Sequence, residues 1–121
     1  MLTPKNHPAD AYRRVEVDAR VEGADGIGLT RIYLEHALDE LDRASRAHHR
    51  GDRIVMSDAL TRAANGIAGL GLGVSDDNPM REPLQHLYGS AETAVRASIT
   101  QFRDDVITRV RYDLRDILAL F

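Results

Sequence analysis

The placement of proline constrains this chain more than any other feature. All four prolines fall in two places, with Pro4 and Pro8 near the start and Pro79 and Pro83 past the middle. Proline interrupts a helix because it lacks an amide hydrogen and clashes with the preceding turn, so the long stretches between and after these pairs are free to form helices. The sequence therefore predicts an all-α protein with helix boundaries near the prolines.

The chain divides into an arm and one domain. Residues 1–22 are predicted to be a flexible N-terminal arm, within which residues 11–21 are long enough for a short helix. Residues 23–121 are predicted to be a helical bundle domain that begins with a glycine-containing turn at 23–28. A chain of 121 residues is long enough for a single core.

The first two long helices are predicted from apolar residues at the 3.6-residue helical period. The first spans about residues 27–50, with Asp25 as N-cap and Gly51 as stop. The second begins near residue 53 and is expected to fray into the glycines between 66 and 73, which are costly inside a helix. The predicted inner faces are Tyr33, Leu34, Ala37, Leu38, Leu41, Ala44, Ser45 and His48 on the first helix, and Met56, Ala59, Leu60, Ala63, Ile67 and Leu70 on the second.

Two further helices complete the predicted domain. The third starts between Asn78 and Pro83, and the fourth runs from about Arg103 to the end, with a turn somewhere in 98–104 that contains neither Gly nor Pro. Short connections favour antiparallel neighbours, so we expect an antiparallel up-and-down four-helix bundle. The predicted inner faces are Leu84, Leu87, Tyr88, Ala91, Val95 and Ser98, and Val106, Val110, Leu114, Ile117 and Phe121.

Charged residues are expected at the surface of this bundle. Several acidic residues stand four places before an arginine, a spacing that stabilises a helix by roughly a few tenths of a kcal/mol per pair. The predicted apolar stripes contain no Asp or Glu, so no buried carboxylate is expected for acid–base chemistry. The predicted pairs are Asp39 with Arg43, Asp42 with Arg46, Asp58 with Arg62, Glu92 with Arg96, and Asp105 with Arg109.

Composition excludes several function classes. The chain has 16 basic and 19 acidic residues, a net charge of −3, and no Lys/Arg run that fits a row of phosphates, so nucleic acid is not an expected partner. The absence of cysteine excludes disulfides, a thiolate zinc site and a Cys nucleophile. Residues 1–10 lack the apolar run of a signal peptide, and no stretch reaches the roughly eighteen apolar residues that span a bilayer. We therefore expect a cytoplasmic protein without membrane insertion.

No metal or cofactor site is predicted. A metal site would need histidines three or four residues apart with carboxylates converging on the same point. His48 and His49 are adjacent and diverge around a helix, whereas His36 and His86 would each need a ligand from another helix. The glycine-rich stretch 66–73 lacks a phosphate-loop motif and follows no strand, so we expect its small residues to admit a neighbouring backbone or to end the helix loosely.

The tyrosines are the candidate anchors for a bound peptide, because an amphipathic phenol is common at the rim of a groove. Tyr112 falls off the main stripe of the last helix and is interpreted as a structural core residue. Tyr12 stands in an otherwise polar arm, where burial of its ring needs a specific reason.

Several segments together resemble the flagellin export chaperones, the FliS family. Ala11-Tyr12-Arg13 is similar to the Ala-Tyr motif that opens that family. The other similar segments are residues 24–29, 32–33 and 37–41 for the family's first long helix, 51–52 for its turn, 59–63 for its second helix and 84–88 for its third. The likeness covers nearly the whole chain in order. It departs at Gly26, where the family has proline, at His36, where the family has a small residue, and at Phe121, where the family often has tryptophan.

The resemblance implies a non-enzymatic chaperone. Such a protein binds the disordered C-terminal segment of flagellin, prevents premature polymerisation and delivers flagellin to the flagellar type III export apparatus. It places Tyr33, Leu84, Leu87 and Tyr88 near the client-binding surface. Tyr12 is then expected either to occupy the client groove as part of a lid when flagellin is absent, or to contact the client directly.

Other function classes stay open at this point. One is a helical-bundle adaptor or dimerisation module, which the sequence separates from a chaperone only through the family resemblance. Another is a small catalytic or metal-binding helical protein, which the lack of converging polar residues on any inner face disfavours. Whether the chain forms a homodimer is also left open.

Overall fold

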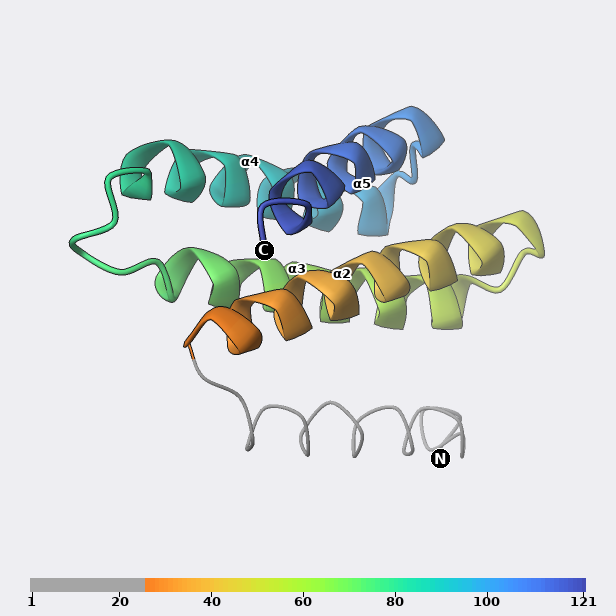
Figure 1. Cartoon of the computed structure of the whole chain (residues 1–121). Coiled ribbons are helices and arrows are strands. Elements are labelled where there is room, and N and C mark those ends of the chain that lie inside the picture. Colours follow the sequence, from red (N-terminus) through yellow and green to blue (C-terminus); the bar gives the residue numbers. More distant parts are fainter. Residues whose placement is uncertain (1–25) are drawn as a thin grey trace.

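The computed structural model describes residues 26–121, which form four α-helices and no strand (Figure 1). Successive helices run in opposite directions, so this part of the chain is the predicted all-α antiparallel bundle. The predicted arm with Tyr12 and the N-cap at Asp25 lie outside the described residues. The helices are α2, Gly26–His49; α3, Arg53–Leu72; α4, Arg81–Thr100; and α5, Asp104–Leu118.

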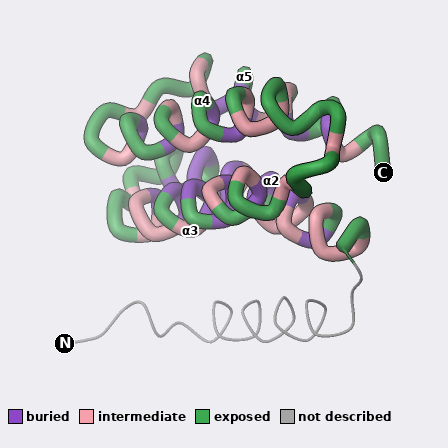
Figure 2. The backbone as a smooth tube through the Cα atoms, turned by 90° about the vertical axis from the view of Figure 1, so that its left-hand side faces the viewer, coloured by how far each residue is buried: buried purple, intermediate pink, exposed green. Residues whose placement is uncertain are grey.

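The helices are arranged in two layers, and the core lies between them. Helices α2 and α3 form one layer, and α4 and α5 lie across it as the second (Figures 1 and 2). All six predicted inner residues of α3 are buried, as are the predicted Leu and Ala residues of α2. The largest fully buried apolar side chains are Leu34, Leu41, Leu60, Ile67, Val95, Ile107 and Leu114.

The predicted inner faces need correction at the ends of the helices. On α2, His48 is exposed and Tyr33 is only partly buried. At the start of α5, Ile107 is buried in place of the predicted Val106, which is only partly buried. Phe121 is 41% exposed, because α5 ends at Leu118 and the residues beyond it no longer follow the helical stripe.

The α2–α3 connection forms as predicted. Gly51 has a φ of +78°, a left-handed conformation that glycine adopts without strain. Asp52 caps α3 because its carboxylate accepts a hydrogen bond of 3.0 Å from the Val55 amide.

The prediction that α3 frays into its glycines is wrong. The helix continues to Leu72, and Gly73 is its C-cap. A β-carbon placed on Gly71 would lie 3.6 Å from Cβ of Tyr88 on α4, so this glycine faces its neighbour at close range. Packing of α3 against α2 and α4 therefore outweighs the low helix propensity of glycine. Helix α4 begins at Arg81, which leaves Pro83 in the first turn as expected.

The α4–α5 connection consists of Gln101, Phe102 and Arg103, inside the predicted range. Gln101 (φ −141°, ψ 92°) and Arg103 (φ −133°, ψ 113°) are extended. The ring of Phe102 stacks on that of His48 at the end of α2, with centroids 4.1 Å apart and planes 18° from parallel. A contact between this connection and the end of α2, distant in sequence, thus helps to hold a turn that contains no glycine or proline.

None of the helices in residues 26–121 combines the length and apolar character that a membrane crossing requires.

Candidate protein-binding site

Tyr88 on α4 stands between two surface cavities. Its side chain is almost fully buried, at 3% exposed, and it lines both. Burial raises the pKa of its hydroxyl above the ordinary range, so the phenol is neutral at physiological pH. A neutral tyrosine at a cavity wall offers an apolar ring and a hydrogen-bonding hydroxyl to a ligand.

The first cavity, of about 270 Å³, lies at the end of the bundle where α2 begins and α5 ends. Its lining is mostly apolar, with a few polar side chains from the loop after α3. It is lined by Gly26, Ile27, Thr30, Leu70, Gly73, Val74, Ser75, Asn78, Leu84, Tyr88 and Phe121. We call it the end cavity.

The second cavity, of about 400 Å³, is an open groove between α3 and α4. Small residues of both helices, Ala68, Gly71 and Gly89, are part of its lining, and Gln85 donates a hydrogen bond of 3.2 Å to the Gly71 carbonyl. It is lined by Ile67, Ala68, Gly71, Leu72, Gln85, Tyr88, Gly89 and Glu92. We call it the α3–α4 groove.

Five of the seven exposed large apolar side chains of the described residues lie at or next to the helix ends where these two cavities are found, and Ile54 and Tyr112 lie elsewhere. The antiparallel order brings the start of α2, the end of α3, the start of α4 and the end of α5 to one end of the molecule. Ile27 is 67% exposed, Leu72 88% and Leu120 80%, and Met80 and Phe121 are exposed as well. Large apolar side chains gathered at one end of a molecule are typical of a surface that contacts another protein.

The structure brings together only part of the predicted site. Leu84 and Tyr88 line the end cavity side by side. Tyr33 and Leu87 are partly buried and pack against the core, and neither lines the end cavity or the α3–α4 groove. The fifth predicted residue, Tyr12, lies outside the described part of the chain.

Sequence reasoning missed other residues of this site and misplaced one tyrosine. Phe121 was expected in the core, but it lines the end cavity. Phe121 lies beyond the C-cap of α5 at Ala119, so it leaves the helical stripe. Tyr112 was interpreted as a core residue, but it is 62% exposed.

A third cavity, of about 320 Å³, lies at the opposite end of the bundle, between the α2–α3 and α4–α5 connections. Met56, Ile99 and Phe102 supply its apolar wall. Its other lining residues are His48, Gly51, Asp52, Arg53 and Thr100. Acidic and basic side chains occur together on this lining, so its charge favours neither an anion nor a cation.

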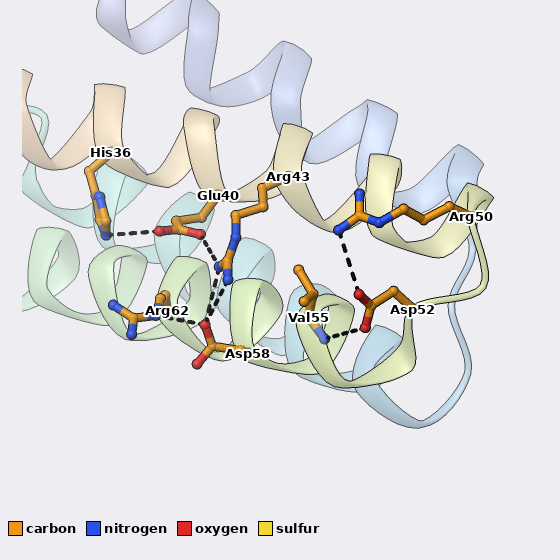
Figure 3. Close-up of polar contacts among 8 residues, drawn as sticks. All are labelled: His36, Glu40, Arg43, Arg50, Asp52, Val55, Asp58 and Arg62. Atoms are coloured by element: carbon orange, nitrogen blue, oxygen red, sulfur yellow. Dashed lines mark hydrogen bonds and ion pairs between the residues drawn. The ribbon is translucent and has the colours of Figure 1, made fainter. Parts of the chain in front are cut away.

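A network of charged side chains crosses the α2–α3 interface (Figure 3), and it corrects the prediction that no carboxylate is buried. Glu40 is fully buried, and its Oε1 accepts a hydrogen bond of 2.9 Å from Arg43 Nη1. Arg43 also donates from both terminal nitrogens, at 3.1 Å, to Asp58 Oδ2 on α3. Arg62 Nε donates to the same oxygen at 2.9 Å.

The predicted surface pairs form in part. Asp58 with Arg62 and Glu92 with Arg96 pair as expected, each at 2.9 Å. The carboxylate of Asp42 instead contacts Arg111 on α5 at 3.1 Å. Asp105 contacts Arg103 at 3.0 Å, and Arg109 contacts Asp113 at 3.6 Å.

Glu40 lies away from the three cavities described above. Its Oε2 accepts no hydrogen bond and lies 4.0 Å from Nε2 of His36. Glu40 lines none of the three cavities described above, so a substrate in them does not reach its carboxylate. A general acid or base must come within hydrogen-bonding distance of its substrate.

The contribution of this network to stability depends on pH through the carboxyl group of Asp58. Burial alone raises the pKa of its carboxyl, but hydrogen bonds and charges from Arg62 and Arg43 outweigh burial and hold that pKa below its usual range. Because the folded pKa is lower than the unfolded one, the stabilisation is present above the unfolded pKa of about 3.9 and is lost as pH falls through the folded pKa.

We therefore expect the urea midpoint of unfolding to fall between about pH 5 and about pH 2, and to fall less in Asp58→Asn. Asp76→Asn is the matched control, because the Asp76 side chain is 92% exposed. Equal pH slopes in the two variants would contradict the assignment.

The histidines at the far end of α2 make contacts other than metal ligation. His49 Nε2 lies 2.9 Å from Asp104 Oδ2, and the neighbouring His48 stacks on Phe102. Over residues 26–121, no group of three or more His, Asp and Glu side chains is arranged to hold a metal ion.

The fold and the cavities define a helical bundle with an apolar surface at one end. Comparison with known proteins adds no relative, since the chain matches no protein-family model, no curated protein and no solved structure.

Proposed function

We propose that this chain is a non-enzymatic cytoplasmic chaperone of the flagellin export type. It binds the disordered C-terminal segment of flagellin, prevents premature polymerisation and delivers flagellin to the flagellar type III export apparatus. The family resemblance supplies the identity of this client. The observation that carries the proposal is the pair of cavities on either side of Tyr88, surrounded by exposed apolar side chains.

The shape of this surface suits an amphipathic helical ligand. A helix laid in a groove inserts apolar side chains at intervals of three and four residues. The end cavity accepts one apolar side chain and the α3–α4 groove another, with the Tyr88 ring between them. A disordered client loses conformational entropy when it folds on this surface, which moderates affinity and favours later release.

Binding to flagellin tests the proposal directly. We expect the purified chain to bind flagellin in calorimetry and to lose that binding when the C-terminal segment of flagellin is removed. Undiminished binding to truncated flagellin, or none to the intact protein, would contradict the proposal. Self-association without flagellin binding would favour the alternative of an adaptor or dimerisation module.

Two leucines of α4 provide a matched test of the site. Leu84 and Leu87 are both partly buried, but only Leu84 lines the end cavity. We expect Leu84→Ala to weaken flagellin binding by about tenfold, since truncation of a binding anchor costs more than about 1 kcal/mol. Leu87→Ala should retain affinity despite a similar loss of stability, measured at a temperature where both variants are folded. Equal affinities for the two variants would place the binding site elsewhere.

The tyrosine hydroxyls are tested separately by Tyr88→Phe and Tyr33→Phe. Tyr88 lines both cavities, whereas Tyr33 packs against the core, so we expect only Tyr88→Phe to lower affinity. If neither variant changes flagellin affinity or folding, the hydroxyls take no part in recognition.

Deletion of residues 1–14 separates the two roles expected of Tyr12. Loss of a lid should raise flagellin affinity and increase dye binding to exposed apolar surface, because a self-occupied groove lowers apparent affinity. Loss of a client contact should lower affinity instead. If the deletion changes neither quantity, both roles are wrong.

A further inference from the structure

The boundary between α4 and α5 is not dictated by the local sequence. No glycine or proline occurs after Gly89, so residues 90–121 contain no strong helix breaker. Gln101 and Arg103 in the connection are good helix formers, and Phe102 is an acceptable one. The same residues can therefore extend α4 into α5 without a break.

What holds the turn is packing between distant parts of the chain. Phe102 stacks on His48, and α5 lies against α2 and α4. The buried face of α5 is a single stripe consisting of Ile107, Val110, Leu114 and Ile117. Two polar contacts tie the helix to α2: Arg111 with Asp42 and Asp104 with His49.

All of these α5 contacts can be made by an α5 that belongs to another molecule. The stripe and both polar contacts connect α5 to α2 or α4 and do not depend on which chain supplies it. Only the geometry of the connection itself changes when α5 is exchanged. Exchange of an identical element is a common route to a dimer, because the closed contacts of the monomer are reproduced.

We propose that two copies of this chain exchange α5. In the dimer, α4 and α5 of each copy join into one continuous helix over residues 81–118. Each α5 then fills the place between α2 and α4 of the other copy. The partner is a second copy of this chain, because its α5 carries the same side chains that pack between α2 and α4 in the monomer. The inference does not depend on flagellin binding.

Proline at position 104 tests the continuous helix. Asp104 is the first residue of α5, a position where proline is favoured, and Arg103 before it has the extended conformation that proline requires of its neighbour. Asp104→Pro is therefore compatible with the turn and incompatible with a helix running through it. Asp104→Ala is the matched control, since it also removes the contact with His49 but permits the helix.

The full-length chain and both variants are refolded from urea over a range of protein concentrations, and the molar mass is measured by light scattering after gel filtration. We expect the dimer fraction of the unmodified chain and of Asp104→Ala to rise with concentration, and Asp104→Pro to stay monomeric. The proposal is overturned if the unmodified chain is monomeric at every concentration, or if Asp104→Pro forms as much dimer.

A distance measurement distinguishes exchange from surface contact between closed molecules. The chain has no cysteine, so Ser90→Cys and Arg115→Cys, both at exposed positions, place two spin labels uniquely. A continuous helix separates these positions by about 37 Å, whereas in the closed molecule α5 folds back toward α4 (Figure 1). With labelled chains diluted in excess unlabelled protein, a dimer that keeps the short closed distance would also overturn the proposal.

Discussion

Replacement of Arg43 by methionine is expected to lower the free energy of unfolding by about 3–5 kcal/mol. Arg43 donates the hydrogen bond that Glu40 Oε1 accepts, and Glu40 is fully buried. Without Arg43 the buried Oε1 of Glu40 loses this hydrogen bond, and removal of one partner of a buried pair costs far more than the loss of a surface pair. Urea denaturation followed by circular dichroism measures the change.

The double variant Glu40→Leu with Arg43→Met is the informative control. Replacement of both partners removes the buried charge together with its counter-charge, so the double variant should be far more stable than Arg43→Met alone. Asp58 keeps its contact with Arg62 in both variants, which leaves the rest of the network matched. A double variant as unstable as the single one would show that Arg43 acts through packing and not through charge.

Leu41→Ala is expected to lower the free energy of unfolding by about 2–5 kcal/mol. Leu41 is fully buried on α2 between the two layers, so its truncation loses apolar burial and leaves a cavity.

Leu72→Ala makes the same chemical change at the end of α3, where the side chain is 88% exposed. We expect it to change the free energy of unfolding by less than about 0.5 kcal/mol. Comparable losses in the two variants would mean that the core does not lie between the layers.

Most of the fold could be predicted because two local signals agree over long stretches: the helical period of the apolar residues, and the positions of proline and glycine at the helix boundaries. All six residues of the predicted inner face of α3 are buried, and Gly51 lies at the predicted end of the preceding helix, whereas the buried Ala64 and Gly66 were not predicted. The end of α3 was mispredicted because the propensity of its glycines is a local quantity. The packing of Gly71 against Tyr88 of α4 depends instead on the tertiary structure.

The buried charges were missed for a related reason. The rule of four-residue spacing considers one helix at a time, whereas Arg43 is shared between Glu40 on its own helix and Asp58 on the next. In the candidate site, Leu84 and Tyr88 share a helix face and line the same cavity. Tyr33 could not be separated from them, because only the packing of α2 determines whether its ring reaches a cavity or the core.

The position of the chain end has a practical consequence for every binding assay. Phe121 lines the end cavity, so a purification tag fused after it would stand at the mouth of that cavity and obstruct an incoming helix. The connection around Gly51 lies at the opposite end of the bundle and is exposed. Immobilisation through a cysteine introduced at Arg50 would therefore present the end cavity and the α3–α4 groove to solution, away from the sensor surface.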